Sequence, residues 1–333
     1  MEENTHNNNE NNLKEKENIP NPEATGFFTL SYKNGDKFSG QMTNGVVDEH
    51  GIYEGSDGIT FEGDFSKKEE EKNDERIKGK LIFDNGNSIY EGEFLDGKFD
   101  GKGVLKNSKG DIYEGSFKSG LKDGQGIFYF SEGDIYIGNF SQNNFDGDGK
   151  LIIKDISEYK GKFKNGKYDG YGMLKSLTNT DILIGIFKEG KMNGEGFQIL
   201  SNGDRYDGAF KDNKFNGYGV YQFSNGDIYK GNFIKGKRSG KGTFYFGEKN
   251  VYQGEFFEDK FYGEGVLFKG NGDMIEGHFE KGLLKGKATF YPKDDMPYDI
   301  NTEEDLDNDI DNDNQSSINT TMENTCSNIN DKI

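Results

Sequence analysis

A spacing of 23 residues, repeated along most of the chain, constrains this sequence more than any other feature. Each unit opens with an aromatic or aliphatic residue followed two positions later by glycine. The opening residues are Phe38, Phe61, Tyr90, Tyr113, Tyr136, Tyr159, Leu183, Tyr206, Tyr229, Tyr252 and Ile275. Most steps are 23 residues, and the longest one contains a charged insertion at 66–77. A fixed period of this length indicates stacked supersecondary units.

The pattern inside a unit predicts a β-hairpin followed by a turn. With the opening residue as position 0, glycine recurs at 2, 7, 11, 13 and 20, phenylalanine at 4, and an apolar residue at 15. Side chains alternate along a strand, so positions 0, 2 and 4 share one face, and we expect the same of 11, 13 and 15. Glycines at 7 and 20 suit the two turns, where positive φ is needed. The predicted fold class is all-β: an elongated single-layer antiparallel β-sheet of tandem hairpins.

Glycine weakens a strand interior unless another group must approach the backbone closely. Aromatic rings of neighbouring positions are the obvious candidates here, because 14% of residues are aromatic and only 31% are apolar. We therefore expect rings to cover bare backbone, burying apolar area without a second layer. The glycines assigned this structural role, or a turn role, are Gly92, Gly101, Gly103, Gly115, Gly124, Gly126, Gly208, Gly217, Gly219, Gly231, Gly240 and Gly242.

The repeat and the distribution of charge divide the chain into three segments. The array spans 26–292 as a half unit and eleven full units. Residues 1–25 and 293–333 carry −4 and −10 of the formal net charge of −19, which leaves −5 for the array. Their Asn-rich and acidic composition predicts a disordered N-terminal tail and a disordered acidic C-terminal tail. The acidic balance disfavours nucleic-acid binding.

Sequence motifs for chemistry are missing, so we expect no enzyme activity, no cofactor and no metal. The glycine pairs of the repeat lack the third glycine and the following helix of a dinucleotide fingerprint. His6, His50 and His278 are far apart, and Cys326 stands alone. One cysteine, no secretory signal and no long apolar run favour a cytoplasmic location.

The units 90–112 (YEGEFLDGKFDGKGVLKNSKGDI) and 113–135 (YEGSFKSGLKDGQGIFYFSEGDI) follow the pattern YxGxFxxGxxxGxGxxxxxxGD throughout. This pattern resembles the MORN repeat (membrane occupation and recognition nexus), over about 26–292. Departures such as Glu49 at position 11 and Ala288 at position 13 leave the period intact. The resemblance implies a twisted sheet with one grooved face, scaffolding roles in cytoskeletal or membrane-cortical structures, binding of helical segments, and self-association through an array end.

Two sets of side chains are candidate interaction residues. A groove for a protein partner is predicted along the repeated rings, which are expected both to hold the sheet and to contact the partner. These are Tyr90, Phe94, Tyr113, Phe117, Tyr136, Phe140, Tyr206, Phe210, Tyr229, Phe233, Tyr252 and Phe256. Lysines at position 8 form a predicted basic edge, which either protects the edge from pairing or attracts acidic groups. These are Lys98, Lys167, Lys191, Lys214, Lys237 and Lys260.

The leading hypothesis is a non-enzymatic scaffold that binds a helical or coiled-coil partner along the groove, located in the cytoplasm, at the cytoskeleton or membrane cortex. One alternative is a module for anionic phospholipids such as phosphoinositides or phosphatidic acid. Another is a regulatory subunit of a lipid kinase, an alternative that rests only on the family resemblance. A homodimer through an array end is also open.

Overall fold

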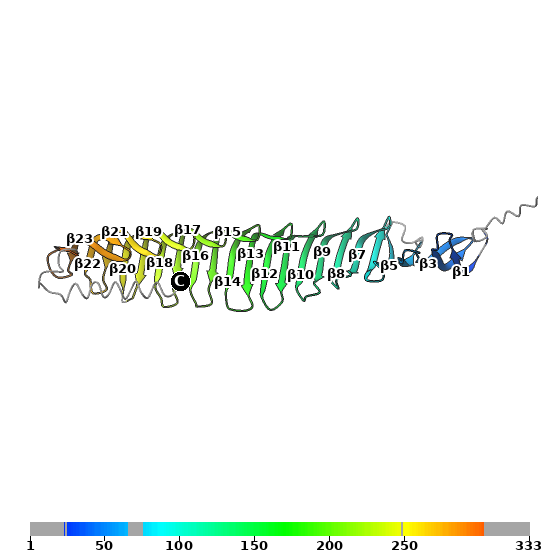
Figure 1. The fold of residues 1–333 in the computed structure, drawn as a ribbon, viewed down its shortest axis with the longest axis horizontal. Coiled ribbons are helices and arrows are strands. Elements are labelled where there is room, and N and C mark those ends of the chain that lie inside the picture. Colours follow the sequence, from blue (N-terminus) through cyan, green and yellow to red (C-terminus); the bar gives the residue numbers. More distant parts are fainter. Residues whose placement is uncertain (1–22, 24, 66–75, 248, 303–333) are drawn as a thin grey trace, which may run out of the picture. The chain divides into compact units, whose positions relative to one another are not determined.

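The computed structural model describes residues 23, 25–65, 76–247 and 249–302. These residues form strands, turns and bends, and no helix occurs among them. The chain divides into two compact units, 1–144 and 145–333. Within each unit every strand lies beside the next one in the chain (Figure 1). The predicted all-β, antiparallel, single-layer fold class is confirmed.

The first unit contains ten strands in an antiparallel meander, each paired with its successor from β1 to β10. They are β1 Gly26–Ser31, β2 Lys37–Thr43, β3 Val46–Glu54, β4 Thr60–Asp64, β5 Ile77–Phe83, β6 Ser88–Leu95, β7 Lys98–Lys106, β8 Ile112–Lys118, β9 Leu121–Tyr129 and β10 Ile135–Ser141.

The second unit continues the same pattern from β11 to β24. Its strands are β11 Asn144–Ile153, β12 Ser157–Lys164, β13 Lys167–Ser176, β14 Ile182–Lys188, β15 Lys191–Ile199, β16 Arg205–Lys211, β17 Lys214–Gln222, β18 Ile228–Ile234, β19 Lys237–Phe246, β20 Asn250–Phe257, β21 Lys260–Phe268, β22 Met274–Glu280, β23 Leu283–Tyr291 and β24 Tyr298–Asn301.

Hairpin tips form as the glycine at position 7 predicts. At the β8–β9 tip, Ser119 and Gly120 both have positive φ, 50° and 86°, as a type I′ turn requires. The Gly120 N–H donates to the Phe99 carbonyl of the preceding hairpin (2.8 Å), so successive tips are tied together. The other turn, at positions 17–21, has the same kind of link: the Ser131 N–H donates to Asp111 Oδ1 of the preceding unit (2.9 Å). This bond explains why aspartate recurs at position 21 of the repeat: its carboxylate binds the turn of the next unit.

The predicted segment boundaries differ in detail from the strands. β24 lies within 293–333, so the segment predicted as an acidic tail begins with an ordered strand that pairs with β23. Ile77, assigned to the charged insertion, is the first residue of β5. Residues 1–22 and 24 of the predicted N-terminal tail, 66–75 of the insertion and 303–333 of the predicted C-terminal tail lie outside the described residues.

Candidate partner-binding groove

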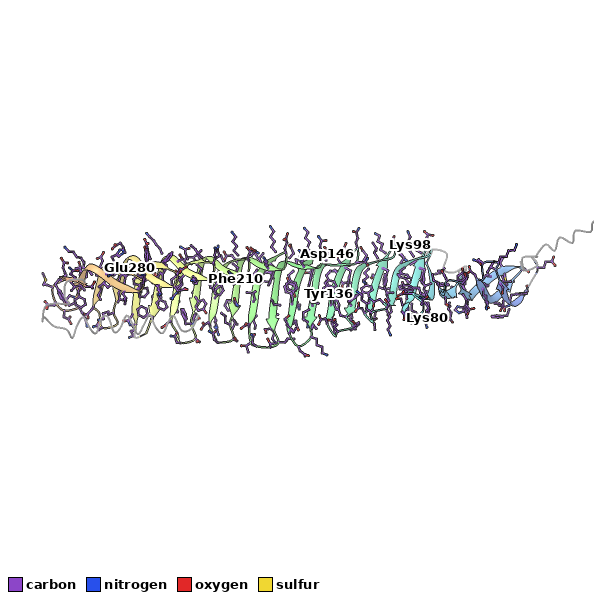
Figure 2. The ribbon with its side chains drawn as sticks, viewed as in Figure 1. Lys80, Lys98, Tyr136, Asp146, Phe210 and Glu280 are labelled. Atoms are coloured by element: carbon purple, nitrogen blue, oxygen red, sulfur yellow. The ribbon has the colours of Figure 1, made fainter. Side chains whose placement is uncertain are left out.

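The rings predicted to line a groove form the core of the sheet instead. All twelve are only 0–4% exposed. In the first unit Tyr90 stacks on Phe99 at 3.8 Å between ring centroids and meets the edges of Phe94 and Phe117 at 5.0 and 5.1 Å. Figure 2 shows Tyr136 and Phe210, of the first and second unit, among the strands. Because other rings close over these side chains, a partner cannot contact them on the folded surface.

The tyrosine hydroxyl explains why position 0 carries tyrosine more often than phenylalanine. Tyr113 Oη donates to the Ser116 carbonyl at 2.9 Å, and Tyr90 makes the same bond to the Glu93 carbonyl at 2.8 Å. Burial raises the pKa of the Tyr113 hydroxyl to about 12, so the hydroxyl stays protonated and can donate. The bond satisfies a backbone carbonyl three residues on, close to the bulge at which the register of the β8–β9 pair shifts.

The glycines at positions 2 and 13 face these rings, as the sequence predicts. Gly103 pairs with Gly92 on β6, and a methyl group added to Gly103 would stand 2.4–2.6 Å from Tyr90 ring and hydroxyl atoms. No side chain fits there without moving the ring. The same arrangement recurs at the other predicted glycines of these two positions. They are Gly115, Gly126, Gly208, Gly219, Gly231 and Gly242.

The prediction for position 11 is wrong. Gly124 was expected on the same face as Gly126, but it has φ of 97°, and a methyl group there would point toward Ser116 on the opposite face. The cause is a β-bulge, because an extra residue in the ladder interrupts the alternation of side chains. The same positive φ occurs at the other three predicted glycines of position 11. They are Gly101, Gly217 and Gly240.

A groove does exist, on the face opposite the rings. In the first unit a shallow hollow runs over β3–β10, and its floor is the bare backbone of the glycines at positions 2 and 13. One wall carries positions 1 and 14, which include Val104, Ile127 and Ile137, and the other carries positions 3 and 12. Each glycine pair therefore holds a ring on one face and leaves a groove on the other.

The wall side chains of the first unit are mostly charged. The acids are Glu62, Asp64, Glu91, Glu93 and Glu114, and the lysines are Lys78, Lys80 and Lys102. Some of them bind one another across strands: Lys102 Nζ donates to Ser116 Oγ at 2.8 Å, and His50 Nδ1 lies 3.5 Å from Asp64 Oδ1. From β7 to β10 the wall also carries apolar side chains, and Val104 on β7 and Ile137 on β10 are exposed. This end offers a partner apolar area next to charge.

In the second unit the corresponding face has two parts. A groove over β17–β21 has a glycine floor and walls that include Tyr218, Lys230 and Glu255. Over β13–β15 the same face is mostly apolar, and Tyr171, 65% exposed, and Ile186 stand out from it. Singly exposed apolar side chains are ordinary, but neighbouring ones mark interaction surfaces.

The six predicted edge lysines share one structural position. Each is the first residue of the second strand of its hairpin, in β7, β13, β15, β17, β19 or β21. Figure 2 labels Lys98 at the hairpin edge of the first unit. Acids of the following tip partly neutralise this edge, since Lys191 lies 3.7 Å from Asp212 and Lys237 lies 3.6 Å from Glu258. The sequence reasoning did not include these pairs.

Position 9 was missed by the sequence reasoning, although it covers the core. Its residue in most units is aromatic or aliphatic, and Met192 at this position is buried. Aromatic ones stack on the tyrosine at position 0, as Phe99 does on Tyr90 and Phe215 does on Tyr206. Two units have a cation instead. Lys122 Nζ lies over the Phe128 ring at 4.7 Å, and Arg238, 2% exposed, lies among four rings and binds Asp259. Bulky residues recur at position 9 in the sequence, and this recurrence could have identified the position as part of the core.

Within the described ranges no group of three or more His, Cys, Asp or Glu side chains is placed to hold a metal ion. The same part of the chain contains no helix that is long and apolar enough to cross a membrane.

Together, the paired hairpins, the glycine–ring contacts and the recurring turns define a tandem-repeat β-protein. The family model described as "MORN repeat" matches seven segments of the chain. They are residues 90–112, 113–135, 159–176, 184–205, 206–228, 229–251 and 252–274. The chain is therefore a MORN-repeat protein. The units at Phe38, Phe61, Tyr136 and Ile275 fall outside these matches. Phe38, Phe61 and Ile275 each pair with the second strand of their own hairpin, and Tyr136 pairs with Phe128 of the preceding unit.

Three solved structures resemble the chain remotely. The TCP10 domain of Danio rerio CPAP in complex with a peptide of Danio rerio STIL is 11% identical, with a TM-score of 0.30, and covers 83% of this chain and 99% of its own. The E1021V mutant of that domain is 10% identical (TM-score 0.22; 68% and 93% covered), and a streptogramin B lyase structure is 14% identical (TM-score 0.14; 83% and 92% covered). These likenesses support no inference about function. A search of curated proteins finds no match.

Proposed function

We propose that this protein is a non-enzymatic scaffold that holds a segment of a partner protein in the glycine-floored groove. The observation that supports the proposal is that the two faces of the sheet have different roles. The rings at positions 0 and 4 are buried in the core, whereas the side chains of the wall positions 1, 3, 12 and 14 lie on the opposite face, away from those rings. The wall side chains, including those that bind one another across strands, therefore face the side on which a partner would lie.

A helical or coiled-coil segment suits this groove better than an extended one. In the middle of a sheet the backbone groups are already paired with neighbouring strands, so a partner on the face must satisfy its own backbone hydrogen bonds. A helix does so. Its pitch of about 5.4 Å is close to the strand spacing of about 4.8 Å, so each helical turn would meet roughly one strand. Such a segment would use anchors at i, i+3, i+4 and i+7.

The test places charge on the apolar end of the first-unit groove. Val104→Lys combined with Ile137→Lys should weaken binding of a partner, first found by proximity labelling and then purified, by about 10-fold or more. Leu121→Lys, at the exposed tip of β9, adds the same kind of charge outside the groove and should leave binding unchanged. Equal binding by all folded variants would refute the groove as the docking site. Live imaging of the tagged protein tests the proposed cytoskeletal or cortical location.

An anionic phospholipid surface is a second candidate, favoured by the hairpin tips of β18–β19 and β20–β21. Ile234 and Phe257 are 56% and 58% exposed at these tips, next to Lys235, Lys237 and Lys260. Apolar tips flanked by lysines could enter a headgroup layer while the lysines bind phosphate. Flotation with vesicles containing phosphoinositide or phosphatidic acid at physiological salt tests this function. Absence of flotation would remove this candidate and leave the protein-binding proposal untouched.

A further inference from the structure

An apolar patch on the second unit is arranged symmetrically about one strand. The groove-side face of β13, β14 and β15 presents seven apolar side chains in neighbouring positions. They are Tyr171 and Met173 on β13, Ile182, Ile184 and Ile186 on β14, and Phe197 and Ile199 on β15. β14 lies in the centre, with its three isoleucines running across the face.

Opposite charges flank this patch at equal distances. Lys160 on β12 and Asp207 on β16 both occupy position 1 of their units, in the same row as Ile184. β12 and β16 are each two strands away from β14. Two residues earlier along each strand, Glu158 on β12 and Arg205 on β16 carry charges of opposite sign, with the order reversed. Glu158 also lies 3.0 Å from Lys150 of the neighbouring strand β11. Lys160, Asp207 and Arg205 are exposed.

We infer that this face binds a second copy of the same chain, face to face, about a two-fold axis that runs along β14. That rotation places β12 of one copy over β16 of its partner, because both strands are equally far from the axis. Lys160 then faces Asp207 of the partner subunit, and Glu158 faces Arg205 of the partner subunit. Both contacts form twice, as an isologous interface requires.

The remaining contacts follow from the same rotation. β13 lies over β15, so Met173 meets Phe197 of the partner subunit, and the Tyr171 hydroxyl approaches Glu195 of the partner subunit. The β14 isoleucines meet their own copies at the axis. Lys175 lies over Ile199 of the partner subunit, where its aliphatic stem can cover that side chain.

Distances and area are compatible with a weak, specific dimer. Packed sheets lie about 10 Å apart, which a lysine and an aspartate extended toward each other can span. β11–β17 cover seven strands at about 4.8 Å each, and three side-chain rows cover about 20 Å along them, so the footprint is on the order of 700 Å² per copy. Specific interfaces bury about 800 Å² per partner. The charges on this face complement those on the same face of a second copy. An unrelated partner protein need not have this complementary pattern.

The experiment uses single charge reversals of the full chain in sedimentation velocity. Lys160→Asp alone faces Asp207, and Asp207→Lys alone faces Lys160, so each variant should raise the dimer dissociation constant about 10-fold or more. An equimolar mixture should restore the dimer as a heterodimer, because each mismatched charge then meets its opposite. Lys230→Asp, at position 1 of β18 and outside the footprint, is the matched control and should dimerise like the unaltered chain.

Several outcomes would overturn the inference. The unaltered chain could stay monomeric at about 100 µM, the single variants could dimerise normally through another surface such as an array end, or the mixture could fail to recover. Circular dichroism confirms that each variant is folded. Binding of a partner protein through the first-unit groove is measured separately with the Val104 and Ile137 variants, so failure of one proposal leaves the other standing.

Discussion

Gly103→Ala should be one of the most damaging small substitutions in the first unit. A methyl group at this position would stand 2.4 Å from Tyr90 Oη and 2.6 Å from two ring carbons. The ring must move, and it cannot tilt away freely because Phe99 stacks on it at 3.8 Å. Overpacking costs about 1–3 kcal/mol, and loss of the Tyr90–Glu93 hydrogen bond adds about 1 kcal/mol. We expect a total of roughly 2–4 kcal/mol.

The chain itself contains a compensated version of this change. In the last unit position 13 is Ala288, and position 0 is the smaller Ile275. Both are buried without a tyrosine between them. Tyr90→Ile should therefore relieve part of the strain, so that the double variant with Gly103→Ala is more stable than the sum of the single effects predicts, by about 1 kcal/mol or more.

Native-state hydrogen exchange of β6–β8 amides is the suitable assay, because repeat arrays need not unfold in one step. Gly97→Ala is the control, since nothing lies within 4 Å of a methyl group there and only its φ of 73° is unfavourable. It should cost about 1 kcal/mol. If Gly103→Ala costs no more than Gly97→Ala, or if the double variant shows no coupling, the ring-over-glycine reasoning is refuted.

Three further effects should be measurable by thermal or urea unfolding. Lys122→Phe should stabilise the first unit by about 1 kcal/mol, because burial already lowers the Lys122 pKa and a stacked ring would replace a desolvated ammonium; a lower midpoint would contradict this. Asp259→Ala should cost about 3–5 kcal/mol by leaving the buried Arg238 guanidinium without its carboxylate, whereas Arg238→Phe should be far milder. Burial raises the Asp204 pKa, but hydrogen bonds, chiefly from Tyr221, outweigh it and lower the pKa overall. Stability from Asp204 is therefore present above about pH 4 and lost as pH falls below that value, and Asp204→Asn should flatten this acid dependence.

The repeat predicted most of the fold because its glycines have a local physical meaning. Glycine at position 7 indicates positive φ whatever surrounds it, and Gly120 and Gly166 adopt it. Alternation of side chains likewise placed Gly126 under the Tyr113 ring. These inferences need only neighbouring residues and the geometry of a hairpin.

The location of the groove was not predictable in the same way. Whether a ring at position 0 is exposed depends on what lies above it, and that cover comes from position 9, as when Phe99 stacks on Tyr90. Position 9 varies among aromatic, aliphatic and cationic residues, so no single residue type marked it. The bulge that turns Gly124 toward the opposite face likewise depends on the register between strands, which one strand's sequence does not specify.

The two-sided use of glycine also limits where this protein can vary. A change at position 2 or 13 disturbs the core ring and the groove floor together, so both are constrained by packing. A change at position 1, 3, 12 or 14 touches only the groove face. Lys160, Ile184 and Asp207 all occupy position 1, yet they are a cation, an aliphatic residue and an anion. Under the proposed function, binding specificity can therefore differ from unit to unit while every unit keeps the same fold, because the proposed binding face and the ring core lie on opposite faces of one sheet.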